Sequence, residues 1–148
     1  MNETAADHPA LPAPGLLRRF GAMLYDSLLL VAVLIVSTAL VRWRAGDAID
    51  PGHGASHIAF QLYLLLVIYG FFGWFWTHGG QTLGMRAWRI QVRRTDGGSV
   101  TWGRAALRFL GALFSALALG AGFLWVLVDP KQRAWHDRIS GTVLVQIS

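Results

Sequence analysis

The chain has 148 residues, of which 54% are hydrophobic and only 14% are charged, and its mean hydropathy is +0.44. This composition lies outside the range of ordinary soluble domains and indicates an integral membrane protein. The absence of cysteine excludes disulfides, thiolate metal sites and a cysteine nucleophile. The net charge of +5 comes from arginines that flank hydrophobic runs, so we expect anionic lipid headgroups as partners and no nucleic acid.

Residues 1–14 form a lead-in in which Pro9, Pro12 and Pro14 stand among small residues, and this pattern predicts disorder. The lead-in carries no basic segment, and no cleavage pattern follows the first hydrophobic run. We therefore expect that run to remain as a permanent anchor. Residues 15–148 are predicted to form a single all-α membrane domain.

Three hydrophobic runs are long enough to cross the hydrocarbon core, which takes about 20 mostly apolar helical residues. Residues 20–41 contain one charged residue, Asp26, and residues 58–76 contain none. Both runs are predicted to be full transmembrane helices. The third run, 109–128, is interrupted by glycines, so it either spans the membrane or turns back as a re-entrant hairpin. These glycines are Gly111, Gly120 and Gly122.

The link after the second run, residues 78–104, is rich in arginine and contains one acidic residue, Asp96. By the positive-inside rule this link and the N-terminus face the cytoplasm, and the link 42–57 lies outside. Within the outer link, Asp47, Asp50 and His53 are expected to be solvated, and we predict no metal site. The arginines of the basic link are Arg86, Arg89, Arg93, Arg94 and Arg104.

Two stretches of the polar region have strand character. Residues 89–93 alternate in polarity and are joined by the turn sequence 96–98 to residues 99–102, which predicts a small cytoplasmic β-hairpin. The β-branched residues 142–147 predict a C-terminal strand that pairs with this hairpin. That pairing places the C-terminus in the cytoplasm and favours the re-entrant arrangement of 109–128, which also leaves fewer basic residues outside.

A short helix at the membrane surface is expected to begin near Asp129, because aspartate suits an N-cap and Pro130 suits the first helical turn. Trp135 would then lie at headgroup depth, with Lys131 and Arg138 near lipid phosphates.

Three motifs stand in order along the chain: Arg-Phe-Gly-Ala-Met-Leu-Tyr-Asp at 19–26, Gly-Gln-Thr-Leu-Gly-Met at 80–85, and Trp-His-Asp-Arg-Ile-Ser-Gly-Thr at 135–142. With these motifs the chain resembles the RDD family of bacterial membrane proteins over about residues 15–145. The arginine and two aspartates that name the family fall here on Arg19, Asp26 and Asp137. Ser140 departs from the alanine often found in the family.

The resemblance implies a multi-pass protein of a bacterial inner membrane. It says little about activity, because the molecular function of the family is largely unassigned. Cation/proton exchange is the activity most often suggested for its members. Within the second motif, Gln81 and Thr82 are candidate supporting residues.

Arg19 and Asp26 are separated by about two helical turns, near 10 Å along the axis, and cannot pair directly. Asp26 lies about 9 Å inside the apolar run. A carboxylate in hydrocarbon costs on the order of 2.5–3.5 kcal/mol, so this one should face protein or water. It either binds a proton or cation, or fixes helix packing by accepting hydrogen bonds or pairing with an arginine such as Arg108.

His136 beside Asp137 has two interpretations. Either the pair relays protons near neutral pH, or Asp137 bonds the backbone or Arg86 and holds the terminal helix in place. The structural interpretation is favoured.

Two hypotheses of function follow. The chain is either a transporter of protons or small cations, or a non-transporting scaffold or regulator. With two or three spans, a transporter needs a homo-oligomer or a membrane protein partner. A scaffold would dock a protein or anionic lipid through its basic cytoplasmic face. No enzymatic activity, cofactor or metal is expected, because no nucleophile, base and orienting group form a motif.

Overall fold

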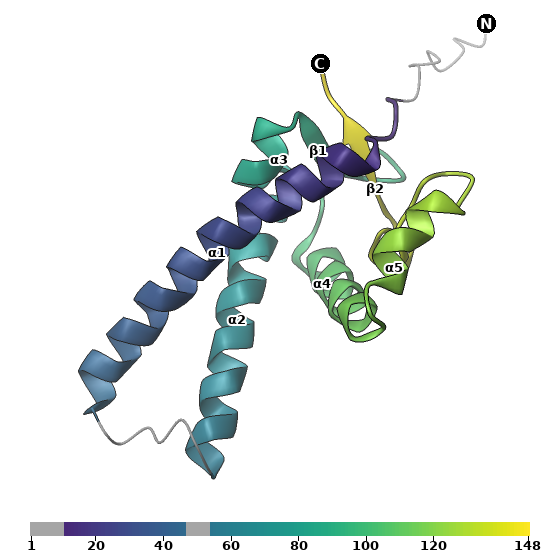
Figure 1. The fold of residues 1–148 in the computed structure, drawn as a ribbon. Coiled ribbons are helices and arrows are strands. Elements are labelled where there is room, and N and C mark those ends of the chain that lie inside the picture. Colours follow the sequence, from purple (N-terminus) through teal and green to yellow (C-terminus); the bar gives the residue numbers. More distant parts are fainter. Residues whose placement is uncertain (1–10, 47–53) are drawn as a thin grey trace, which may run out of the picture.

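The computed structural model of the chain describes residues 11–46 and 54–148 (Figure 1). Two long helices, α1 (Leu16–Ala45) and α2 (Ala55–Thr77), form an arm that extends from the rest of the molecule (Figure 1). Both are long and apolar enough to cross a membrane, as predicted. The first ten residues of the lead-in and the acidic outer link with Asp47, Asp50 and His53 lie outside the described residues.

The two long helices expose apolar side chains. In each helix only 6% of the most hydrophobic stretch is buried within the chain. Leu28 is 68% exposed on α1 and Leu66 is 67% exposed on α2. Such surfaces suit a lipid environment, where apolar side chains need no protein cover.

The third hydrophobic run is broken, as its glycines predict. Helix α4 (Trp102–Leu117) is followed by α5 (Ala121–Leu124) and the 3-10 turn η2 (Trp125–Leu127), and the two halves are bent by 108°. The bend passes through Gly120, which has a φ of 79° and ends the helical path at low cost because it lacks a Cβ.

The strands β1 (Ile90–Arg94) and β2 (Thr142–Gln146) form an antiparallel pair whose register runs from Ile90–Gln146 to Arg94–Thr142. The C-terminal strand therefore pairs with the basic link, as predicted. The second strand of the predicted hairpin is wrong, because residues 99–101 form no strand and α4 already begins at Trp102. The Thr101 side chain accepts a hydrogen bond from the Arg104 amide and so acts as a helix N-cap.

The predicted start of the surface helix is also wrong. Helix α6 covers Trp135–Ser140, and the chain at Pro130 forms only a turn. The Asp129 carboxylate accepts a hydrogen bond from the Arg133 amide at 2.8 Å, which closes that turn. At the true helix start, the Asp137 carboxylate accepts from the Ala134 amide at 3.0 Å.

A small core lies where the sheet meets the arm. Ile90, Val92 and Leu144 from the sheet are buried together with Ala22 of α1 and Trp76 of α2. The short helix α3 (Leu83–Ala87) packs against α1 and leads into β1.

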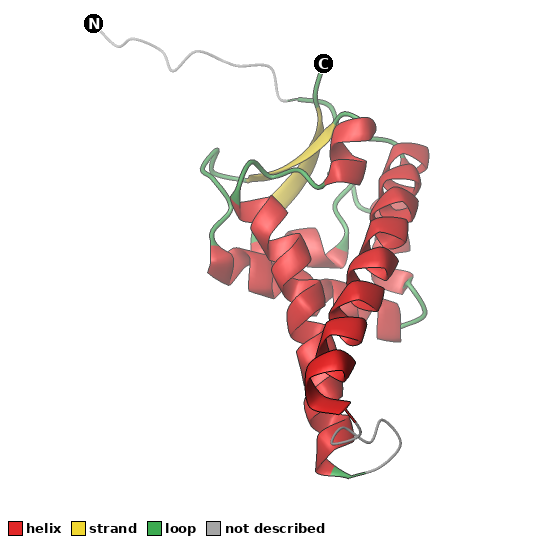
Figure 2. Cartoon of the chain, turned by 90° about the vertical axis from the view of Figure 1, so that its left-hand side faces the viewer, coloured by secondary structure: helices red, strands yellow, loops and turns green. Residues whose placement is uncertain are grey.

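Residues 11–15, which precede α1, lie at this end of the arm together with the basic link and the C-terminus (Figure 2). The Gln146 amide donates to the Pro12 carbonyl at 2.8 Å, and the Ile147 amide donates to the Arg89 carbonyl at 2.9 Å. A complete third span would put the C-terminus on the opposite side of the membrane from the basic link, so these bonds fit a third segment that enters and returns.

Candidate functional site

Asp137 lies at the centre of a buried ionic network that joins three helices. Its carboxylate accepts a hydrogen bond from Nη1 of Arg108 on α4, and its second oxygen lies 3.6 Å from Nη1 of Arg19 on α1. The Asp137 side chain has no exposed surface, and Arg108 is 3% exposed. The same Arg108 nitrogen donates to Oγ1 of Thr142 at 2.9 Å. The network therefore ties the first helix, the bent third segment and the C-terminal elements together.

Each arginine of the network has further contacts. Arg19 donates from Nε to the Pro14 carbonyl at 3.1 Å and from Nη2 to the Gln132 carbonyl at 2.8 Å. The Arg108 guanidinium lies over the Trp76 indole, 5.1 Å from the ring centroid, which is a cation–π distance. Arg19 thus fixes two loops, and Arg108 reaches from α4 to the end of α2.

The electrostatics of α6 keep His136 neutral and Asp137 ionised. Burial of the His136 ring, together with the positive charge of Arg108, lowers the pKa of His136 to about 4. Burial opposes ionisation of Asp137, but Arg108 and the hydrogen bonds to the carboxylate outweigh it and lower the pKa of Asp137. A neutral His136 fits the favoured structural interpretation of this pair better than the alternative of a proton relay near neutral pH.

Asp26 occupies a separate polar niche on α1 and is 3% exposed. Thr82 donates its hydroxyl hydrogen to one carboxylate oxygen, and the Gly84 amide donates to the other at 2.8 Å. The Thr82 hydroxyl also accepts from the Met85 amide at 3.1 Å, so the 80–85 motif forms a helix cap that encloses the carboxylate.

Glycine is required at position 84, because a Cβ there would stand 2.3 Å from the Ala22 carbonyl oxygen. Gln81, in contrast, donates to the Ile90 carbonyl at 2.8 Å and steadies the entry to β1. Within this motif, Thr82 and Gly84 therefore bind the Asp26 carboxylate, whereas Gln81 binds the backbone at the start of β1.

For both aspartates the sequence left two kinds of partner open, and the structure forms the hydrogen bonds and not the named arginine pairs. Arg108 pairs with Asp137 and not with Asp26, and Asp137 makes no ion pair with Arg86. Within the described ranges, no arginine, lysine or histidine nitrogen lies within 4.0 Å of the Asp26 carboxylate. Asp26 is held instead by hydrogen bonds alone, which the sequence left open as its other structural alternative.

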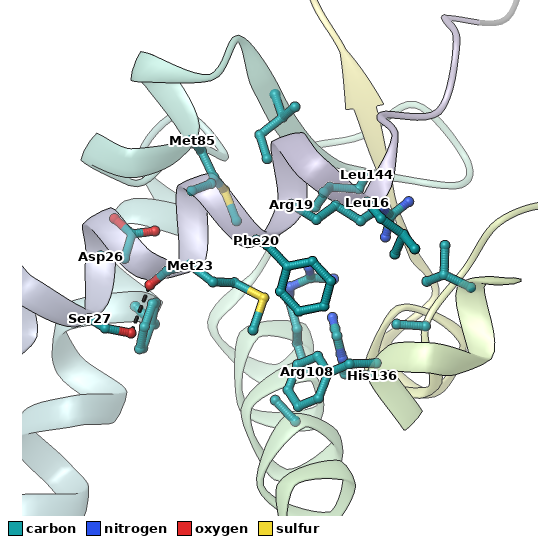
Figure 3. Close-up of a pocket in the computed structure, with 17 residues that line it drawn as sticks. Leu16, Arg19, Phe20, Met23, Asp26, Ser27, Met85, Arg108, His136 and Leu144 are labelled. Atoms are coloured by element: carbon teal, nitrogen blue, oxygen red, sulfur yellow. Dashed lines mark hydrogen bonds between the residues drawn. The ribbon is translucent and has the colours of Figure 1, made fainter. Parts of the chain in front are cut away.

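A pocket of about 200 Å³ connects the two polar sites (Figure 3). Its walls are mostly apolar, and four predicted site residues line it: Arg19, Asp26, Arg108 and His136. Asp26 lies at one end of the pocket, whereas Arg108 and His136 lie together at the other (Figure 3). Across the part of the chain that the structure describes, no three His, Asp or Glu side chains gather to hold a metal ion.

Sequence reasoning missed Thr142 and Trp76 as partners of Arg108. Thr142 belongs to a β-branched stretch and therefore reads as an ordinary strand residue, although it is fully buried. Trp76 stands at the end of a span, where tryptophan is common because its ring suits the membrane–water interface, so its position gives no signal of a contact with Arg108.

Comparisons with known proteins identify the family of the chain. The model of the RDD family matches residues 13–141, and this range contains every residue of both polar sites except Thr142. The chain belongs to the RDD family. Among curated proteins it is similar to the uncharacterized protein RP437 of Rickettsia prowazekii (strain Madrid E), with 32% identity over 100 residues. That match covers 64% of this chain and 56% of the Rickettsia protein. No solved structure matches the chain.

Proposed function

We infer that this RDD family membrane protein moves protons or small cations across a bacterial inner membrane, and that Asp26 binds them. The observation that carries the proposal is the environment of Asp26. It is a buried carboxylate inside a candidate span, it lines a pocket, and no cationic side chain of the described residues pairs with it. An ionisable group at such a place is costly and is typically retained for function.

The niche around Asp26 suits more than one protonation state. The Thr82 hydroxyl can rotate, so it is able to donate to an ionised carboxylate or accept from a protonated one. The Gly84 amide fixes the position of the second oxygen in both cases. These partners support exchange of a proton at Asp26 without rearrangement of the backbone.

Transport by this chain requires additional walls. Two candidate spans and one bent segment are too few to enclose a path across a bilayer, so the proposal includes a homo-oligomer or a membrane protein partner. The positive-inside rule supports a cytoplasmic location for the basic link, and hence for both ends of the described chain that meet it.

The proposal is tested by cation-driven proton flux in proteoliposomes. We expect the native protein to give flux and the Asp26→Asn variant to lose it, because an amide does not exchange a proton near neutral pH. Asp96→Asn is the matched control, since Asp96 is an exposed carboxylate outside the helices. Both variants must insert and assemble like the native protein. Absence of flux from native protein with Na⁺, K⁺ and Li⁺, or full flux from Asp26→Asn, would contradict the proposal.

A scaffold is the second candidate, and the exposed basic surface favours it. Arg86, Arg89 and Arg93 are exposed around α3 and β1. A scaffold would lose partner capture when these three arginines are replaced by glutamine, and Asp26→Asn would then alter only folding or assembly.

A further inference from the structure

The pocket end formed by α4 and α6 contains polar groups that have no partner in the described part of the chain. Both hydrogen bonds that Arg108 donates leave from Nη1, and its buried Nε has no acceptor. Nδ1 of His136 is also buried and without a partner, and the residue is only 9% exposed. Buried polar atoms are nearly always hydrogen-bonded, so these two nitrogens are candidates to bind a ligand.

Both residues, Arg108 and His136, line the pocket. Figure 3 shows their side chains close together beside Phe20. A ligand group at this end of the pocket lies near both side chains. The Arg108 guanidinium can donate to it, and the His136 imidazole can donate in its Nδ1–H tautomer.

The charge at this end of the pocket favours an anion. Arg19 and Arg108 converge on a single carboxylate, that of Asp137, so one positive charge remains without a counter-charge. Asp26 does not supply it, because that carboxylate lies at the opposite end of the pocket and is engaged by Thr82 (Figure 3). A phosphate or carboxylate group would complete the network through charge-assisted hydrogen bonds.

The remainder of the pocket favours an apolar tail. Phe20 and Met23 line the pocket and are also 48% and 41% exposed on the outer surface of α1. Because this part of α1 belongs to a candidate span, the two side chains join the pocket wall to the lipid-facing surface. A ligand with an anionic head and a hydrocarbon chain would therefore satisfy both parts of the site.

We propose that the pocket binds an anionic membrane lipid, with its headgroup phosphate on Arg108 and His136 and an acyl chain passing Phe20 and Met23. The volume of about 200 Å³ suits part of a headgroup with the start of one chain, and the rest of the lipid stays in the bilayer. The proposal does not depend on transport, because it concerns occupancy of the opposite end of the pocket from Asp26.

The test measures binding of dioleoyl-phosphatidylglycerol to delipidated protein in detergent, by native mass spectrometry. Dioleoyl-phosphatidylcholine and inorganic phosphate are the comparison ligands. Both lipids carry a phosphate, but the choline ammonium of phosphatidylcholine cancels its charge. We therefore expect phosphatidylglycerol, whose net charge is negative, to bind about tenfold more tightly than phosphatidylcholine, which corresponds to about 1.4 kcal/mol. Equal binding of the two lipids would show that the site does not select an anionic headgroup, and it would overturn the proposal. Phosphate binding as tight as the lipid would identify a small-anion site and overturn it.

A matched pair of variants on α4 locates the site. Ala112 lines the pocket, whereas Ala116 is exposed on the same helix and lines none of the described pockets. Ala112→Phe is expected to weaken phosphatidylglycerol binding about tenfold by filling the site, and Ala116→Phe is expected to leave it unchanged. Equal effects of the two variants, or none, would contradict the proposed location.

A second measurement uses the native protein and is independent of how the variants fold. A phosphatidylglycerol with a photoreactive group near the start of its acyl chain is expected to crosslink to the peptide that contains Phe20 and Met23. Crosslinks confined to α2, or equal crosslinking by a phosphatidylcholine analogue, would overturn the proposal.

Discussion

The buried carboxylate of Asp137 explains how one residue can hold distant parts of the chain together. Two arginines share it, and neither can lose it without leaving a cationic group in a site with little access to water. Removal of one partner from a buried ion pair costs about 3–5 kcal/mol, because the other charge remains buried and uncompensated. The single aspartate therefore carries more of the stability than a surface ion pair would.

We expect Asp137→Asn to lower the free energy of unfolding by about 3–5 kcal/mol. Thermal unfolding of the purified protein in detergent checks this. Asp96→Asn is the control, because the Asp96 pair with Arg94 is exposed and such pairs contribute about 0–1 kcal/mol. An Asp137→Asn protein that unfolds at the native temperature would show that the network does not hold the fold.

His136 makes stability depend on pH in a defined window. Its folded-state pKa of about 4 lies below the ordinary value of 6.5, so the unfolded chain binds more protons between these values. The contribution of neutral His136 is complete above pH 6.5 and is lost as pH falls toward 4. The loss is about 3 kcal/mol, at 1.4 kcal/mol for each pKa unit.

This dependence is measurable as the unfolding temperature between pH 4 and pH 8. We expect His136→Gln to flatten the profile in that window, because glutamine does not titrate. His78→Gln is the control, since His78 is exposed at the end of α2. A variant profile as steep as the native one would mean that other groups cause the acid sensitivity.

At the scale of the element, α4 has one buried face and one exposed apolar face. One face carries Ala105, Arg108, Gly111 and Ser115, which are buried, and the other exposes large apolar side chains such as Leu110 and Phe114. The buried residues follow helical spacing, so one stripe of the helix packs on α6 and delivers Arg108 to the network. The packing is close, because a Cβ on Gly111 would stand 2.9 Å from the His136 Cα.

Two glycines of α4 therefore respond differently to alanine. Gly103→Ala is expected to stabilise the protein by up to about 1 kcal/mol, because Gly103 has open space around it and alanine is the better helix former. Gly111→Ala is expected to destabilise it by about 1–3 kcal/mol, because backbone of α6 must move. Unfolding temperatures of the two variants check this, and a stabilising Gly111→Ala would show that α4 and α6 pack less closely.

The sequence predicts elements well where one local signal dominates. Run length identifies α1 and α2, and Gly120 with Gly122 predicts the break in the third segment. The errors fall where two local signals compete. Residues 99–101 are β-favouring, yet Thr101 serves as an N-cap, and Asp129 is a typical N-cap that instead closes a turn.

The partners in the site are harder to predict than its members. Arg19, Asp26 and Asp137 stand out in the sequence because charges are rare in hydrophobic runs or belong to a family motif. Several of their contacts join residues far apart in the chain, such as Arg108 to Asp137, 29 positions apart, and Arg19 to Gln132, 113 positions apart. No periodicity relates such positions, since only the folded backbone brings them together.

At the scale of the whole molecule, the two-stranded sheet decides how the chain enters and leaves the arm. β1 follows the second span and β2 follows the bent segment, and the two strands pair in a register of five residues each. Charge counting in the sequence favours a third segment that returns to the side it entered from, and the pairing of β1 with β2 fits the same arrangement. A chain whose third segment crossed the bilayer completely would have to break every bond of the sheet.

The arrangement predicts which positions share a side of the membrane. The chain contains no cysteine, so a single introduced cysteine reports its own location. Ser99→Cys lies in the basic link, Ser148→Cys at the C-terminal end of the described chain, and Ala55→Cys at the far end of the arm, and all three native residues are exposed. In oriented membrane vesicles, a membrane-impermeant maleimide should label Ser99→Cys and Ser148→Cys from the same side and Ala55→Cys from the opposite side. Labelling of Ser148→Cys together with Ala55→Cys would mean that the third segment crosses the membrane, and it would contradict the pairing of β1 with β2 in the bilayer.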